Sequence, residues 1–312
     1  MPFRPTHQTS LLLPALIITL SACGGSSSDG AGNGGGDNGG DQATLVIGAD
    51  NAAAALVHAR LAMEHLPRVQ RNANIIISQG LNGSPTCDNP DGSFELAQDG
   101  NGAPQQAVFE NCVDPSYTSR TFDGRIDFDF SNPNLPYSRF VGYTNAVSLG
   151  ADTGYQWAVE GAFTIRPEED GNVFGIALIE NADATVHYTV NAQGNSLLLG
   201  SRFEDFSVRF DSTVQFNDTP FSTLAANGRL YLSNELAQGW TRISTPHALT
   251  DPDSGGFCYA NGEVVVEGAN GTRAQLDYNG TDLMFTVNGV TVVNGDCQAL
   301  LEELLEEAGL GL

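Results

Sequence analysis

Oxygen-bearing side chains gather in several turns of this chain and could bind a hard cation. Asp88 and Asp91 form one such pair, and Asp251 and Asp253 form another. Calcium prefers clustered carboxylate and carbonyl oxygens, so these are the groups that it would need. None of the acidic turns has the EF-hand spacing, and Asp, Asn and Gly are common in turns for backbone reasons alone. We therefore expect no metal, with calcium at these aspartates as the minor alternative.

Two histidines, His58 and His65, stand seven residues apart in a segment with helical periodicity. This spacing brings their side chains to nearly the same face of a helix, where they could contribute to a metal site. A zinc site needs further ligands at a characteristic spacing, and the neighbouring sequence has none. We therefore expect packing or surface histidines. His187 alternates with apolar neighbours in a strand pattern, and we expect it to face solvent without a catalytic role.

The residue types that the chain lacks exclude several kinds of chemistry. All 13 basic residues are arginine, and without lysine there is no P-loop, Schiff base or Ser–Lys dyad. The H-E-x-x-H, C-x-x-C and G-x-S-x-G patterns are also absent, and the matches to G-x-G-x-x-G lie in a glycine-rich spacer. The net charge of −24 argues against nucleic-acid binding. The sequence therefore favours a protein without enzymatic activity.

The first residues have the layout of an export signal. A basic start precedes the apolar run Leu11–Leu20, which is too short for a membrane-spanning helix of roughly 20 residues. The run ends in Leu20-Ser21-Ala22-Cys23, which resembles the lipobox of bacterial lipoproteins. The resemblance implies cleavage before Cys23 and acyl chains such as palmitate on that cysteine. With Gly24 next, it implies anchoring in the outer membrane of a Gram-negative bacterium, facing the periplasm or the cell surface. Ordinary signal cleavage, with Cys23 as a spare thiol, is the alternative.

The composition divides the chain into four segments. We expect residues 1–22 to be the lipoprotein signal peptide, and 23–44 to be the acylated cysteine with a flexible tether rich in Gly, Ser and Asp. Residues 45–77 are expected to be helical, and residues 78–312 to form an antiparallel β domain.

Between Ala49 and Asn72, apolar residues recur at three- and four-residue spacing, which predicts an amphipathic helix. Pro67 predicts a bend or a break in this helix. Its polar side carries Arg60, Glu64, Arg68 and Arg71.

Beyond residue 78 the pattern changes to an alternation of apolar and polar residues, which is typical of an antiparallel sheet with one buried face. We expect a mainly β fold, as a meander, sandwich or open roll, with a short C-terminal helix capped by Asp296. Asn279-Gly280 and Asn288-Gly289 predict tight hairpins near the end. Glycines recurring every 33 to 37 residues mark either a repeat of strand units or ordinary strand entries; they are Gly124, Gly161, Gly194, Gly228 and Gly262.

Four cysteines follow Cys23. In an exported chain an even number of cysteines indicates disulfides, and four cysteines allow three connectivities. We favour the local pairs, Cys87–Cys112 and Cys258–Cys297.

These features predict a non-catalytic binding or structural protein of the cell envelope, with the membrane as its partner through the lipid anchor. The first alternative is a carrier that holds a lipid or other apolar ligand between sheet and helix, and the layout is similar in outline to lipoprotein carriers of the outer membrane. The carrier's cavity would be lined by residues such as Phe128 and Phe210. The second alternative is a hydrolase, which would need a cleft with a perturbed carboxylate pair. Trp157 and Trp240 are expected in the core rather than on a carbohydrate platform.

Overall fold

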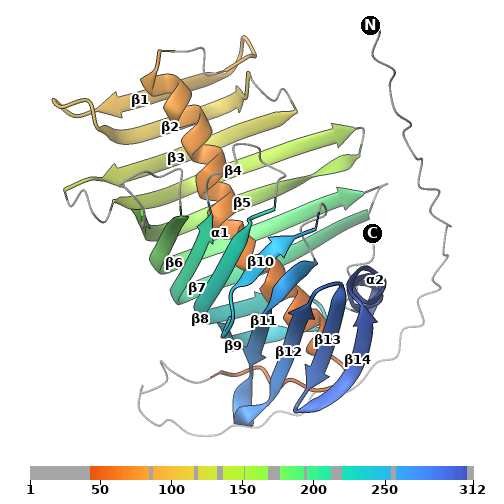
Figure 1. Ribbon diagram of the computed structural model, residues 1–312. Helices are drawn as coiled ribbons and strands as arrows, with labels where there is room; N and C mark the ends of the chain where they lie inside the picture. Colours follow the sequence, from red (N-terminus) through yellow and green to blue (C-terminus); the bar gives the residue numbers. More distant parts are fainter. Residues whose placement is uncertain are drawn as a thin grey trace, which may run out of the picture. The chain divides into compact units, whose positions relative to one another are not determined.

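In the computed structural model, one antiparallel sheet contains all the strands of the described residues (Figure 1). The structure describes residues 43–83, 87–115, 119–131, 136–150, 152–167, 176–192, 195–211, 220–253 and 258–307, which belong to one compact unit, Asp41–Leu312. The 14 strands are β1 (Ser93–Gln98), β2 (Pro104–Val113), β3 (Arg120–Asp129), β4 (Tyr137–Gly150), β5 (Thr153–Pro167), β6 (Ile176–Ala192), β7 (Asn195–Asp211), β8 (Thr223–Ser233), β9 (Gln238–Ser244), β10 (Leu249–Pro252), β11 (Tyr259–Glu267), β12 (Arg273–Asn279), β13 (Asp282–Val287) and β14 (Val290–Asp296).

The sheet is a meander, because strands that follow one another in the chain lie side by side. The one irregularity is at β9 and β10, which both lie between β8 and β11 and pair with both. A mainly β fold with an antiparallel sheet and a short C-terminal helix is therefore confirmed. Of the three arrangements expected, the meander is the one present.

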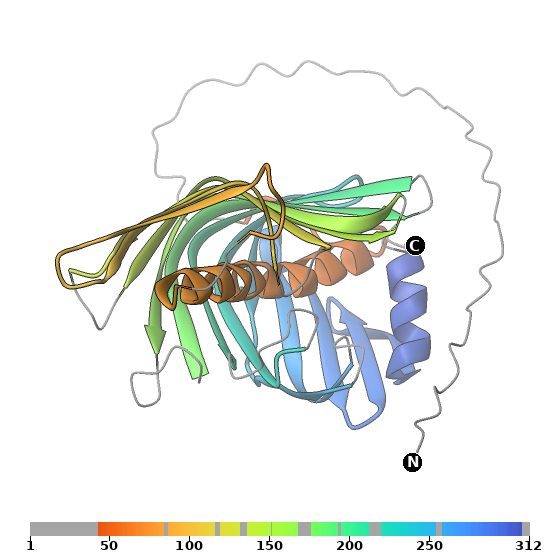
Figure 2. The same cartoon turned by 90° about the horizontal axis from the view of Figure 1, so that it is seen from above.

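A single long helix, α1 (Ala52–Leu81), crosses one face of this sheet. It contacts strands from β6 to β8 and also β1, β11 and β12, and the sheet curves around it (Figure 2). We call the side of the sheet that carries α1 the inner face and the opposite side the outer face.

The helix is longer than the sequence predicted. The expected helix is present, but it begins at Ala52, continues through Pro67 and ends at Leu81, beyond the expected end at Asn72 and beyond residue 77. Proline removes one intrahelical hydrogen bond, but Pro67 is buried and the following turns are packed, with Ile76 fully buried. Burial of these turns against the sheet outweighs the local preference to break, because most helical stability in proteins comes from tertiary packing.

The residues before α1 tie its start to the sheet. The backbone N–H groups of Thr44 and Leu45 donate to the carbonyl of Trp240, at 2.9 and 3.1 Å. The N–H of Ile47 donates to the Thr272 hydroxyl at 2.9 Å. The predicted tether lies outside the described residues up to position 42, and Thr44 is already part of the β domain.

Periodic glycines mark the places where the strands bend. Gly124, Gly161, Gly228 and Gly262 all have positive φ angles, whereas Gly194 lies outside the described residues. A Cβ on Gly161 would lie 2.4 Å from a backbone carbonyl of β6, so no other residue fits there without a shift. Three of these glycines lie next to or opposite a register shift, and such bulges bend a strand. The spacing therefore reflects the curvature of the sheet around α1.

Two disulfides and a capped helix fix the ends of the described sheet. The bonds are Cys87–Cys112 and Cys258–Cys297, the two local pairs that the sequence favoured. The short helix α2 (Cys297–Glu307) begins after Asp296, whose carboxylate accepts the N–H of Ala299 at 3.1 Å.

The terminal hairpins are tight, as expected. Asn288 and Gly289 both have positive φ and form a two-residue turn. The other turn consists of Gly280 and Thr281, one residue later than predicted, because Asn279 pairs with Asp282 as the last rung of the ladder.

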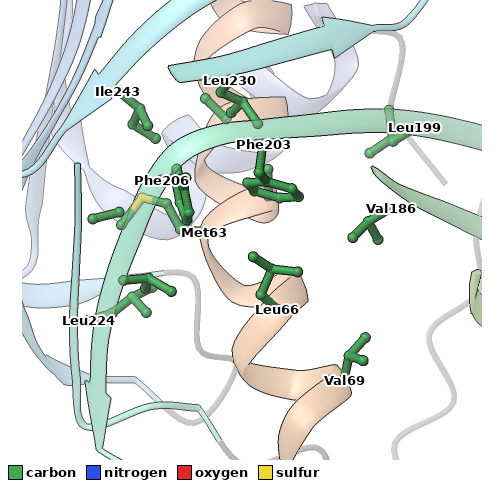
Figure 3. Packing of buried hydrophobic residues seen from close by; sticks show 14 of the residues in the cluster. Met63, Leu66, Val69, Val186, Leu199, Phe203, Phe206, Leu224, Leu230 and Ile243 are labelled. Atoms are coloured by element: carbon green, nitrogen blue, oxygen red, sulfur yellow. The ribbon is translucent and has the colours of Figure 1, made fainter. Parts of the chain in front are cut away.

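The core fills the space between α1 and the inner face. Side chains from one stripe of the helix meet side chains from β6 to β9, as Figure 3 shows. The labelled and buried members are Met63, Leu66, Val69, Val186, Leu199, Phe203, Phe206, Leu224, Leu230 and Ile243. In the part of the chain that the structure describes, no helix combines the length and apolar character needed to cross a membrane.

Candidate ligand-binding site

The candidate site begins with one stripe of α1. Leu61, Glu64, His65 and Arg68 occupy positions i, i+3, i+4 and i+7, which places them on the same helix face. This face points toward β5 and β6, and all four side chains line one pocket.

Aromatic side chains of two strands form the opposite wall. Tyr155 and Trp157 are two residues apart on β5 and therefore share a face. Tyr188 of β6 is the direct partner of Trp157 in the ladder. The Trp157 and Tyr188 rings stack at 5.2 Å, and Tyr155 meets Trp157 edge-on at 5.0 Å. Helix and strands together line an open pocket of about 260 Å³.

A network of opposite charges borders this pocket. Glu64 forms ion pairs with Arg60 at 2.8 Å and with Arg68 at 2.5 Å, and we call these three residues the inner triad. Burial alone would raise the pKa of Glu64, but the two guanidinium groups outweigh it and lower the pKa to about 2. Glu64 is therefore a carboxylate at neutral pH and is already bound on both sides.

Two buried polar side chains in the pocket wall lack hydrogen-bond partners. His65 is 2% exposed and Trp157 is 5% exposed, and neither ring nitrogen of His65 nor Nε1 of Trp157 has a partner among the described residues. Burial is the main cause that lowers the pKa of His65, and the nearby His58 lowers it further, to about 3. The imidazole is therefore neutral. Buried polar groups in native proteins are almost always hydrogen-bonded. These groups therefore mark a place where a partner belongs.

The other helix histidine has a complete set of partners. Asn234 donates to Nδ1 of His58 at 2.9 Å, because its oxygen already accepts two backbone N–H groups. Nε2 therefore carries the proton and donates to the Ser201 hydroxyl at 3.0 Å. Burial lowers the pKa of His58 to about 4. His58 is thus a packing residue, as expected, whereas His65 faces the pocket.

The remaining candidates from the sequence lie apart from this pocket. Phe210 packs edge-on against Phe221, and Phe128 packs against the half-exposed Phe130, so neither lines it. Trp240 is half-buried on the outer face, where the guanidinium of Arg229 lies 4.6 Å from its ring. The expectation of a core position is met by Trp157 and not by Trp240.

The carboxylates that the sequence singled out form no cluster with the pocket. Asp88 and Asp91 lie before β1, and Asp251 and Asp253 lie in and after β10. Within the described ranges no three His, Cys, Asp or Glu residues are grouped in a way that could hold a metal ion. Calcium at these aspartates stays a prediction.

A pair of carboxylates that the sequence did not single out lies on the outer face of β11 and β12. Glu263 and Asp277 are ladder partners. Burial, and after it the Glu263 charge, raises the pKa of Asp277, although the hydrogen bond from Gln275 acts in the opposite direction. Glu263 also binds Arg273 at 3.1 Å and His247 at 3.2 Å. His247 is an exposed residue, and His187 is also exposed, as expected. The network belongs to the sheet surface.

The sequence did not reveal the pocket as a unit. Alternation places Tyr155 and Trp157 on one face, and the helical period groups Glu64, His65 and Arg68. Their meeting depends on which strands α1 crosses, and that contact is non-local. The residue types gave no signal of this contact, because arginines on the polar side of an amphipathic helix normally indicate a solvated face. Cys23 lies outside the described residues.

Comparison of the chain with protein-family models, with curated proteins and with solved structures finds no match.

Proposed function

We propose that this protein is a non-catalytic binding protein of the bacterial cell envelope, and that it binds a small ligand between α1 and the inner face. The observation that carries the proposal is the 260 Å³ pocket whose wall includes His65 and Trp157, two buried side chains with unpartnered polar atoms. Binding sites typically combine apolar and aromatic walls with a few polar groups that fix the ligand. This pocket has that composition.

The titration behaviour of the pocket favours binding over catalysis. General acids and bases work best with a pKa close to the working pH. The pKa of Glu64 is about 2 and that of His65 is about 3. Both groups therefore keep one protonation state near neutral pH, which suits a fixed recognition surface.

The pocket size favours a small ligand over a long acyl chain. At roughly 30 Å³ for each water molecule, a pocket of about 260 Å³ holds the equivalent of about nine waters. The rest of the helix–sheet interface is filled by the core, including Leu66 and Phe203, which are fully buried.

Binding is tested on protein that is purified from the bacterial cell envelope. We expect native mass spectrometry of the full-length chain, purified from bacterial envelopes, to show one bound compound per chain. Leu61→Trp should abolish it, because the larger side chain fills the pocket. Leu198→Trp, at an exposed outer-face position, is the matched control and should retain it. No compound in the parent protein, or equal occupancy in both variants, would contradict the proposal.

The proposed anchor rests on the lipobox at Leu20-Ser21-Ala22-Cys23. Acylation of Cys23 would hold the domain at the outer membrane through a tether that ends where Thr44 joins the sheet. The strongly acidic chain gains little attraction from anionic headgroups, so the acyl chains would supply the membrane affinity. Cys23→Ser should move the protein from the membrane to the soluble fraction. Unchanged membrane partitioning of this variant would contradict the anchor.

A further inference from the structure

The unpartnered polar atoms continue from the pocket wall to the neighbouring strand on the same face of the sheet. Asn145 of β4 is the ladder partner of Trp157. It is fully buried, and neither its amide nitrogen nor its amide oxygen has a hydrogen-bond partner in the described parts of the chain. His65, Trp157 and Asn145 thus form one group of buried polar side chains without protein partners.

The chemistry of this group specifies what it binds. The indole N–H of Trp157 can only donate, whereas the neutral imidazole of His65 has one donor and one acceptor. The amide of Asn145 offers both functions as well. A carboxylate ligand would supply acceptors only, and an ammonium ligand would supply donors only. Hydroxyl groups supply both functions from a single atom.

The charges around the pocket favour an uncharged ligand. An anion would lie near the Glu64 carboxylate, and a cation would lie near the Arg68 guanidinium, which lines the same pocket. Both groups are already paired with each other. A neutral ligand leaves this pairing undisturbed, and its hydroxyl groups can still hydrogen-bond to either side chain.

The walls of the pocket favour a ring with an apolar face. Tyr155, Trp157 and Tyr188 provide aromatic surface, and Leu61 adds an aliphatic contact from the helix. The volume of about 260 Å³ admits a single six-membered ring with its substituents.

From these observations we infer that the ligand is a neutral sugar ring, a single pyranose that lies against the aromatic wall and directs hydroxyl groups to His65 and Trp157. The inference rests on the proposed binding function and specifies its ligand class. Asn145 lies beside Trp157 on the next strand and supports the site through water that the ligand orders.

The fluorescence of Trp157 reports ligand binding in the experiment that tests this inference. The chain has two tryptophans, so Trp240→Phe leaves the fluorescence of Trp157 alone. The full-length Trp240→Phe protein, in a detergent without a sugar headgroup, is titrated with glucose, galactose, N-acetylglucosamine, benzoate and phenyltrimethylammonium. We expect saturable changes in emission with at least one of the sugars and none with the two charged compounds.

Two variants in the same background test the site. His65→Phe should weaken sugar binding about tenfold, because it removes a hydrogen-bonding partner of a buried ligand. His247→Phe, which changes an exposed histidine, should bind as the parent does. Circular dichroism checks that each variant folds, and Asn145→Leu, similar in shape and without the amide, replaces His65→Phe if that variant does not fold.

The possible outcomes separate the two proposals. Saturable binding of benzoate or phenyltrimethylammonium, weakened by His65→Phe, with no response to sugars would overturn the sugar class and leave the binding function standing. Equal sugar affinity in the His65→Phe and His247→Phe proteins would overturn the location of the site. No response to any compound, together with no compound in the native mass spectrum, would overturn the binding function as well.

Discussion

The inner and outer faces of the sheet carry similar sets of side chains in different surroundings. Each has a glutamate held by two arginines, a tryptophan and a histidine. On the outer face the glutamate is Glu204, which lies 2.8 Å from Arg202 and 2.6 Å from Arg229, and we call these residues the outer triad. The Glu64 side chain of the inner triad is 9% exposed, whereas that of Glu204 is 25% exposed and its partner Arg202 is 53% exposed.

Because both triads consist of the same residue types, the difference in burial determines how much each triad contributes to stability. Exposed ion pairs contribute little to stability, because solvent screens them and mobile side chains lose entropy. Removing one member of a buried group leaves an uncompensated charge in a medium of low polarity. The inner triad lies entirely within α1 and therefore neutralises the charges that the helix buries beside the pocket, whereas the outer triad is a surface feature around Trp240.

The largest expected effect is loss of the carboxylate from the inner triad. Glu64→Gln leaves Arg60 and Arg68 buried with like charges, so we expect the free energy of unfolding to fall by about 3–5 kcal/mol. Glu204→Gln makes the same change in the outer triad and should cost less than about 1 kcal/mol. Urea denaturation of both variants measures the difference. Similar losses would show that the inner triad is solvated in solution.

A smaller contrast is expected for apolar truncation. Leu66 of α1 is fully buried against the inner face, whereas Leu198 is 57% exposed on the outer face. Leu66→Ala should destabilise the protein by about 3 kcal/mol, since it removes contacts and leaves a cavity. Leu198→Ala should change the free energy of unfolding by less than about 0.5 kcal/mol. If Leu66→Ala were as mild as Leu198→Ala, α1 would not be packed on the sheet as described.

The sequence predicted the features that depend on local patterns. Alternation located the strands, and the positive φ of Asn288 and Gly289 agrees with the turn expected from their residue types. Cys87 and Cys258 are bonded to the partners expected from their positions in the chain.

Features that depend on distant contacts were not predicted. The polar side of α1 is largely buried: Arg60 is 4% exposed, although an arginine in an amphipathic pattern normally indicates solvent. The helix also passes Pro67, since the packing that permits this involves strands far away in the chain. The pocket follows from the same docking, and so Tyr188 could not be grouped with His65 from sequence.

The smallest expected effect at neutral pH concerns the pocket histidine itself. His65→Phe removes two unpartnered polar atoms from a buried position, so we expect it to raise the free energy of unfolding by about 1 kcal/mol at pH 7 in ligand-free protein. His247→Phe, at an exposed position, should change it by less than about 0.5 kcal/mol.

The same variant has a clearer effect on the pH dependence of stability. The pKa values of His58 and His65 are lowered from 6.5 to about 4 and about 3. Between pH 6.5 and 5 the unfolded chain therefore binds protons that the folded protein does not, so stability falls as the pH falls. Each histidine contributes roughly 1.4 kcal/mol per pH unit well below 6.5. His65→Phe should remove about half of this slope, and His247→Phe should not reduce it. An unchanged slope in His65→Phe would mean that this imidazole is protonated or solvated in the folded protein, and the distinction between the inner and outer histidines would fail.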